Sequence, residues 1–277
     1  PVLVFDMKAD VWEPRSFRMS SYDNYPELGV SIEDYVATVE IQRPPHNFFS
    51  YDLIQSLADC FEALGDDDNC RSIVLCAQGK SFCAGADFSN SGANAGRRDG
   101  GHLYQEAVRL FRTPKPVIGA IQGAAIGGGL GLALMPDFRV VCPEARFSAN
   151  FTRLGFHPGF GLTVTLPEII GKSKAQLMFY TSRRIKGEEA LAMGLADALV
   201  PMEELREAAT GLATEIAQCS PLGIVETRRT MRGDLADRVK AATDHELQIQ
   251  DRLRVTDDFK EGVRAMGERR LPVWQGR

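Results

Sequence analysis

The sequence predicts an α/β fold in which strands and helices alternate up to about residue 200, followed by a helical region. Short apolar runs rich in valine and isoleucine are followed by segments with apolar residues at helical spacing. Turns that contain glycine and proline separate these segments. After Pro201 the pattern is almost entirely helical. We therefore expect an α/β core over residues 35–201 and a helical C-terminal region over residues 202–277.

The bulk composition is that of a globular chain long enough to bury a sizeable core. Its 277 residues are 44% hydrophobic and 25% charged. The formal net charge is −5 and basic residues are scattered, which argues against nucleic acid or an anionic membrane as a partner. The six cysteines form no C-x-x-C pair and no metal-ligand pattern with the histidines. We expect them to be buried, reduced thiols in a cytoplasmic protein that binds no metal.

The first 34 residues carry no clear element of the core. They lack the basic-then-apolar pattern of a signal peptide, and the chain contains no apolar run of the roughly 18 residues that a membrane span needs. We expect residues 1–34 to be an N-terminal extension that is either flexible or, in its first part, foreign to the natural protein. Met19 is a candidate natural start.

The elements of the first half follow from local patterns. From Tyr35, “YVATVEIQRP” alternates like a strand and ends at two prolines. “SYDLIQSLADCFEALGDDDN” has helical apolar spacing, and Ser50 is its candidate N-cap. “RSIVLCAQ” is a buried strand, and “GKSFCAGADFSNSGANAGRRDGGH” is a loop. “LYQEAVRLFRT” is a helix that the following prolines end.

The second half repeats this scheme before the chain becomes helical. “PVIGAIQG” and “FRVVCP” are strands, and “GGGLGLALMP” and “KAQLMFYTS” are helices. “GEEALAMGLADALVP” gives a helix, a turn and a short strand. Four helical segments complete the chain: “MEELREAATGLATEIAQC”, “PLGIVETRRTMRG”, “LADRVKAATDHELQIQDRLRV” and “DDFKEGVRAMGERR”.

The run “AIGGGLGLAL” is the first candidate for a functional site. Consecutive glycines allow a tight strand-to-helix turn and a close approach of a ligand to the backbone. The first amides of a helix have no intrahelical acceptor, so they could hold a developing oxyanion. Close helix packing explains the same glycines. The run is neither G-x-G-x-x-G nor a P-loop, which argues against a nucleotide site.

Three segments together carry a family resemblance. “GKSFCAGADF”, “PVIGAIQGAAIGGGLGLALMPDFRVV” and “TDDFKEGVRAMGERRLPVWQGR” resemble, in family order, the enoyl-CoA hydratase/isomerase superfamily, also called the crotonases. The resemblance runs from about Tyr35 to Arg277. It implies a crotonase-like spiral of β-β-α turns with a C-terminal helical trimerisation region. It also implies a homotrimer or a dimer of trimers, with no cofactor other than the coenzyme A of the substrate.

The resemblance also implies a site for an acyl-CoA thioester. The thioester carbonyl would lie between the backbone amides of Ala86 and Gly128, which would stabilise an enolate. The loop from Lys80 to Phe88 would contact the adenine and pantetheine. Besides Ala86 and Gly128, the residues expected to touch the substrate are Lys80, Ala84, Asp87, Phe88, Tyr104 and Phe151.

The chain departs from the family where the hydratases carry two glutamates. The first position, three residues beyond Gly128, is Gly131. Glycine there lowers helix stability by about 1 kcal/mol relative to alanine. The glycine could be present because open space is needed above the helix, or because another segment packs closely against it. The second position, in “FSANFTRLG”, is Phe151. Neither residue can move a proton, so hydration by the usual pair is not expected.

Other residues could supply an acid or base. His157 in “RLGFHPGFGLT” follows the second glutamate position, and histidine is a residue type suited to general acid/base catalysis, although this one could equally be packed in the loop. An aspartate used by some isomerases is replaced by Gly159. His102 and Glu106 lie beside Tyr104 on a helix that often lines the acyl pocket, but such residues are more often exposed. In some relatives the tail segment that here carries His245 and Glu246 closes the site. Phe156 and Phe160 could join Phe151 in shaping the acyl pocket, and Asp137 is expected to be structural.

These observations predict a lyase or isomerase of the enoyl-CoA hydratase/isomerase type that acts on an acyl-CoA through an enolate. One alternative is hydration or isomerisation with His157 or Glu106 as acid/base. Another is hydrolysis of a C–C or thioester bond with His157 activating water. A third is an acyl-CoA-binding protein without turnover.

Overall fold

The computed structural model describes residues 22, 24–86, 96–98 and 101–277. Within them, six strands form a sheet in the order β1-β2-β3-β6-β8-β11, in which β1 and β2 are antiparallel and the other pairs are parallel. These strands are β1 Leu28–Glu33, β2 Val36–Ile41, β3 Ser72–Ala77, β6 Val117–Ile121, β8 Phe138–Val141 and β11 Ala198–Leu199. All residues of β3 and β6 are buried, as expected for central parallel strands.

A second, smaller sheet accompanies the first. It has the order β10-β9-β7, with β7 Ala124–Ile126, β9 Arg146–Ser148 and β10 Ile185–Lys186. Isolated bridges extend this arrangement, from Phe49 to Ala86 and from Cys83 to Ala125. Successive turns of the chain therefore contribute one stretch to each sheet, as β6 and β7 do and as β8 and β9 do. This is the expected spiral. A separate antiparallel pair of two-residue strands is formed by β4 Arg97–Arg98 and β5 Gly101–His102.

The helices of the core cover these sheets. The predicted cap of α1, Tyr51–Asp66, is confirmed because the Ser50 hydroxyl accepts a hydrogen bond from the Leu53 amide at 3.2 Å. Helix α1 packs on α2, Leu103–Phe111. The remaining core helices are α3 Gly128–Ala133, η1 Thr152–Leu154, α4 Leu162–Ile170, α5 Lys172–Thr181 and α6 Gly187–Met193.

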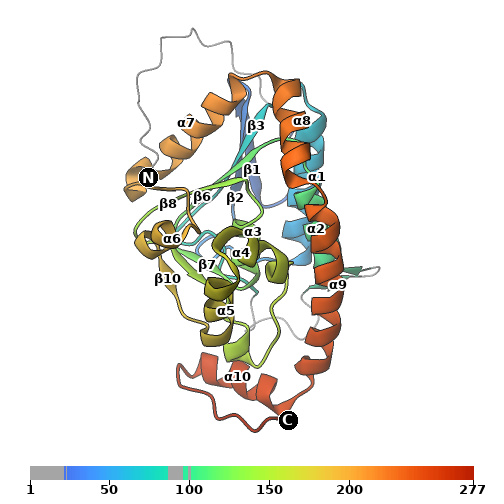
Figure 1. The fold of residues 1–277 in the computed structure, drawn as a ribbon, viewed down its shortest axis with the longest axis vertical. Helices are drawn as coiled ribbons and strands as arrows, with labels where there is room; N and C mark the ends of the chain where they lie inside the picture. The colour runs from blue at the N-terminus through green and yellow to red at the C-terminus, as the bar shows by residue number, and fades with distance from the viewer. Residues whose placement is uncertain (1–21, 23, 87–95, 99–100) are drawn as a thin grey trace.

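The helical C-terminal region has the four predicted segments. After η2, Met202–Glu204, come α7 Leu205–Ala217, α8 Pro221–Arg232, α9 Leu235–Arg254 and α10 Asp257–Gly267. Helix α7 packs on β3 and β6, whereas α8 and α9 follow one side of the molecule and α10 lies at the end opposite α7 (Figure 1). The Asp137 carboxylate forms ion pairs with Arg228 and Arg232 of α8, each at 2.9 Å, and accepts a hydrogen bond from the Val117 amide. Asp137 therefore joins the tail to the sheet.

Two sequence-based expectations need correction. The strand β1, Leu28–Glu33, pairs with β2 along its whole length, so the sheet begins inside the segment assigned to the N-terminal extension. Five cysteines are buried free thiols, but Cys219 is exposed near the end of α7, where only one face of the helix is covered. None of the helices in the described ranges is long and apolar enough to cross a membrane.

Candidate active site

The glycine run forms the turn from β7 into α3. Gly127 precedes the helix with φ of 57°, a left-handed conformation that glycine adopts without strain. A Cβ atom on Gly129 would lie 2.0 Å from the Cys83 carbonyl oxygen, and one on Gly128 would lie 2.0 Å from the Phe49 ring. The glycines are therefore required by the close approach of two neighbouring segments.

One of those segments is the loop after β3, which lies along β7. The Cys83 amide donates to the Ala124 oxygen at 2.9 Å, and the Ile126 amide donates back to the Cys83 oxygen at 3.1 Å. Gly85, with φ of 86°, faces the Ile126 carbonyl at the end of β7. These contacts bring the Ala86 segment against the start of α3. Neither the Ala86 amide nor the Gly128 amide donates a hydrogen bond to an acceptor among the residues that the structure describes.

The space above Gly131 is filled by an aromatic ring. A Cβ atom on Gly131 would lie 2.6 Å from Cδ1 of Phe160 and 2.7 Å from its Cβ and Cγ. Phe160 is completely buried and has φ of 63°, in the left-handed region that residues other than glycine rarely adopt. Of the two readings of Gly131, room above the helix and close packing, the structure supports close packing.

The other two positions where the sequence resemblance led us to expect carboxylates in relatives are also apolar or blocked. Phe151 is buried near Gly127. A Cβ atom on Gly159 would lie 1.9 Å from the Tyr104 hydroxyl oxygen. That hydroxyl donates to the side-chain oxygen of Gln250 at 3.0 Å, and burial, followed by the negative charge of Glu246, raises the Tyr104 pKa. Tyr104 is therefore a neutral hydrogen-bond donor at physiological pH.

His157 lies on the same loop as Phe160 but faces the tail. Its Nδ1 is 2.8 Å from the Pro158 carbonyl oxygen, and its ring centroid is 6.5 Å from that of His245 on α9. Because a carbonyl oxygen can only accept, Nδ1 carries the proton and Nε2 is the basic nitrogen of the neutral ring. The loop thus presents His157 to α9 and Phe160 to α3.

Glu246 anchors this loop from α9. Its carboxylate is fully buried and accepts the Gly161 amide at 2.8 Å and the Thr163 hydroxyl and amide at 2.6 and 3.1 Å. Burial raises the Glu246 pKa, although these hydrogen bonds and the nearby His157 oppose that increase. The sequence did not predict these hydrogen bonds, because Gly161 and Glu246 are 85 residues apart along the chain.

The polar side chains at α2 that were expected to be exposed are instead held in contacts with the protein. His102 is buried, and its Nδ1 accepts the Tyr104 amide at the start of α2. Burial, assisted by Arg97 and Arg254, lowers the His102 pKa to about 4. Glu106 is held by Arg109 at 2.5 Å and by the Tyr51 hydroxyl at 3.1 Å, on the side of α2 that faces α1. The ion pair makes Glu106 a poor candidate for a free base.

The predicted coenzyme A contacts are only partly described. Lys80 is exposed and Ala84 is partly buried on the loop before Ala86, whereas Asp87 and Phe88 lie outside the described residues. Sequence reasoning missed Phe49 as a site residue, although “RPPHNFFS” places it two residues after the buried Asn47. Among the described residues, no group of three His, Cys, Asp or Glu side chains could hold a metal ion.

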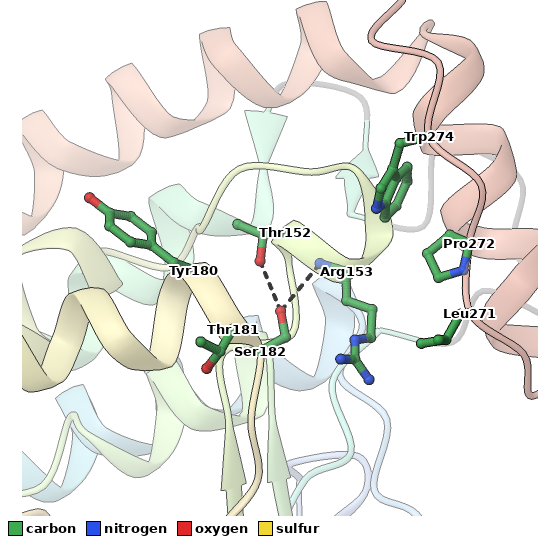
Figure 2. Close-up of a pocket in the computed structure, with 8 residues that line it drawn as sticks. All are labelled: Thr152, Arg153, Tyr180, Thr181, Ser182, Leu271, Pro272 and Trp274. Atoms are coloured by element: carbon green, nitrogen blue, oxygen red, sulfur yellow. Dashed lines mark hydrogen bonds between the residues drawn. The ribbon is translucent and has the colours of Figure 1, made fainter.

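A separate surface cavity of about 340 Å³ lies between η1, the end of α5 and the C-terminal segment. In Figure 2 the Ser182 hydroxyl joins the Thr152 hydroxyl at 2.9 Å and the Arg153 amide at 3.2 Å on one side of this cavity. Trp274, Pro272 and Leu271 lie across from them. None of the predicted site residues lines this cavity, so we place the candidate site at the glycine turn.

The spiral of two sheets with a helical tail defines the crotonase class of folds. The family model for enoyl-CoA hydratase/isomerase matches residues 31–277. A crotonyl-CoA hydratase from Syntrophomonas wolfei is 32% identical over 251 residues, covering 89% of this chain and 96% of its own. The crystal structure of an enoyl-CoA hydratase/isomerase from Pseudoalteromonas atlantica superposes with a TM-score of 0.83 at 29% identity, covering 90% of this chain and all of that one.

A second solved structure agrees with the first. EchA1_1 from Mycobacterium paratuberculosis superposes with a TM-score of 0.81 at 28% identity and covers 91% of this chain and 99% of its own. The chain belongs to the enoyl-CoA hydratase/isomerase family and is an enzyme of the crotonase superfamily.

Proposed function

We propose that this enzyme acts on an acyl-CoA thioester whose carbonyl oxygen is held by the backbone amides of Ala86 and Gly128. Both amides would donate to the oxygen as negative charge develops on it, which stabilises the enolate formed at the α-carbon. Preorganised donors of this kind contribute about 10²–10³ in rate for each donor. The proposal requires no cofactor beyond the coenzyme A of the substrate.

The observation that carries this proposal is the pairing of the two segments. The reciprocal hydrogen bonds between Cys83 and β7 fix the loop that bears Ala86 against the turn that bears Gly128. The amides of Ala86 and Gly128, which donate to no acceptor within the described residues, come from these two adjoining segments. Backbone donors held in this way need little reorganisation during a reaction, which is the condition for electrostatic stabilisation of a transition state.

We propose that the reaction is not hydration by a pair of glutamates. The family resemblance puts Gly131 and Phe151 at the two glutamate positions, and the Phe160 ring fills the space above Gly131. A water molecule therefore has no carboxylate at either position to orient it or to remove its proton. We propose a reaction that proceeds from the enolate without water addition. Lys80 and Ala84 would contact the coenzyme A portion, Tyr104 and Phe151 the acyl portion.

We also propose that the enzyme assembles as a homotrimer or a dimer of trimers through its C-terminal region. Within the described part of the chain, most of the exposed large apolar side chains lie there, including Leu222, Met231 and Val255. A single chain would leave these side chains in water, and association would cover them. Sedimentation equilibrium measures the assembly directly. A monomer at micromolar concentration would contradict this part of the proposal.

The central experiment measures binding and turnover together. Titration calorimetry with butyryl-CoA should show binding, whereas crotonyl-CoA should keep its conjugated enoyl absorbance when mixed with the enzyme. Ala86→Pro removes one donor amide and should weaken thioester binding, and Ala86→Gly keeps that amide and serves as the matched control. Rapid loss of the enoyl absorbance would contradict the argument from Gly131 and Phe151. Equal binding by both Ala86 variants would contradict the role of its amide.

A further inference from the structure

We infer that Phe160 determines the acyl-chain specificity of this site and that the enzyme accepts short-chain acyl groups. The inference rests on the proposed function, because it takes the Gly128 amide as the point where the thioester oxygen is bound. It concerns the space beyond that point, toward α2 and α9.

Three aromatic side chains fill this space. The Phe49 ring lies directly against Gly128, and its centroid is 6.3 Å from that of Phe160. The Phe160 ring covers Gly131, and its centroid is 6.4 Å from that of Tyr104 in an edge-to-face arrangement. An acyl chain that extends from the carbonyl in this direction meets the Phe49 and Phe160 rings after a few carbon atoms.

Phe160 is the fixed member of this group. Its neighbours are Gly159, which packs on the Tyr104 hydroxyl, and Gly161, whose amide donates to Glu246 at 2.8 Å. The loop is therefore attached to α2 and to α9 on both sides of Phe160. An uncommon left-handed conformation at a buried phenylalanine persists only where surrounding contacts enforce it, and such positions concentrate at functional sites. Phe160 thus acts as a rigid wall.

Removal of the ring should open the pocket. Each methylene group that becomes buried improves affinity by about fourfold, so room for two or more methylenes gives at least about tenfold. Two variants are suitable. Phe160→Ala removes the ring, and Phe160→Gly also suits the φ of 63°, so it should fold even where the alanine variant is too unstable.

The experiment compares the affinities for butyryl-CoA and octanoyl-CoA, with free coenzyme A as reference, by titration calorimetry. The wild-type enzyme should bind octanoyl-CoA no more tightly than butyryl-CoA. In Phe160→Ala or Phe160→Gly the ratio should shift toward octanoyl-CoA by at least about tenfold. Phe156→Ala is the matched control: Phe156 lies on the same loop, but its ring packs on Phe259 of α10 at 4.9 Å, so the ratio should not change.

The outcomes separate this inference from the proposed function. Wild-type preference for octanoyl-CoA would overturn the inference and leave the thioester site intact. An unchanged ratio in folded Phe160 variants, or an equal shift in Phe156→Ala, would overturn it as well. Failure of the wild-type enzyme to bind any of the three ligands would overturn the proposed function and the inference together.

Discussion

The contact between Gly131 and Phe160 predicts an unusual effect of a common stabilising mutation. Replacement of a glycine by alanine inside a helix normally stabilises a protein by about 1 kcal/mol. In this structure the new Cβ atom would lie 2.6–2.7 Å from Cδ1, Cβ and Cγ of Phe160. Because Cβ and Cγ lie on the axis about which the ring turns, rotation of the ring moves Cδ1 but leaves the other two contacts in place. Overpacking of this kind costs about 1–3 kcal/mol, and we expect Gly131→Ala to destabilise the enzyme by up to about 2 kcal/mol.

A second substitution should reverse the sign of this effect. Phe160→Gly removes all three atoms that meet the new Cβ, and in that background Gly131→Ala should stabilise by about 1 kcal/mol. Phe160→Ala keeps one of them, its own Cβ at 2.7 Å, and should relieve the contact only in part. Urea unfolding of the four members of the cycle at one protein concentration measures the coupling, which should equal the overpacking cost of about 1–3 kcal/mol. Stabilisation by Gly131→Ala in the wild-type background would refute the packing argument.

Three further predictions concern other parts of the structure. His102→Asn keeps the capping acceptor but cannot titrate. Because the folded pKa of about 4 lies below the ordinary 6.5, the wild type should lose stability as pH falls between these values. Between pH 7 and 4.5 the free energy of unfolding of the wild type should fall by about 2 kcal/mol more than that of His102→Asn. An equal fall in the two proteins, measured by urea unfolding at each pH, would contradict this. Ser50→Ala should cost about 1 kcal/mol through the lost cap, measured by urea unfolding, and no change would exclude the cap as a source of stability. His157→Gln should change the affinity for butyryl-CoA by no more than about twofold, because the His157 ring faces α9 and not the thioester site. A twofold change corresponds to about 0.4 kcal/mol. A larger loss by calorimetry would return His157 to the site.

The longer elements were predictable from the sequence because their signals are local. Ser50 and the apolar spacing that follows it lie within α1 itself, and the buried run of β3 is continuous. The three-residue strands β7 and β9 were not identified, because a strand of that length is too short to show alternation. Their partners come from distant parts of the chain. Pairing with β9 makes β7 a strand, and pairing with both β7 and β10 makes β9 one.

The glycine turn was predictable from the sequence, whereas the side chains that pack around it were not. The glycines of the turn are conspicuous in the sequence, because glycine is required wherever two backbones approach closely. The expectation that His102 is exposed was wrong, since α9 covers α2 and the sequence does not show which helix of the tail does so. The same limit applies to Gly131. Its partner Phe160 lies on another turn of the spiral, so the glycine alone left its role open.

The residue types at positions 131 and 160 therefore depend on each other. A glutamate at position 131 needs the space that Phe160 occupies, and Phe160 can occupy it only because position 131 has no side chain. The loop that carries the ring is attached to α2 through Tyr104 and to α9 through Glu246. The apolar wall thus depends on the C-terminal region as well as on the core. A single substitution at Gly131 cannot place a carboxylate above the helix while that wall remains, because the new side chain would meet the base of Phe160 first.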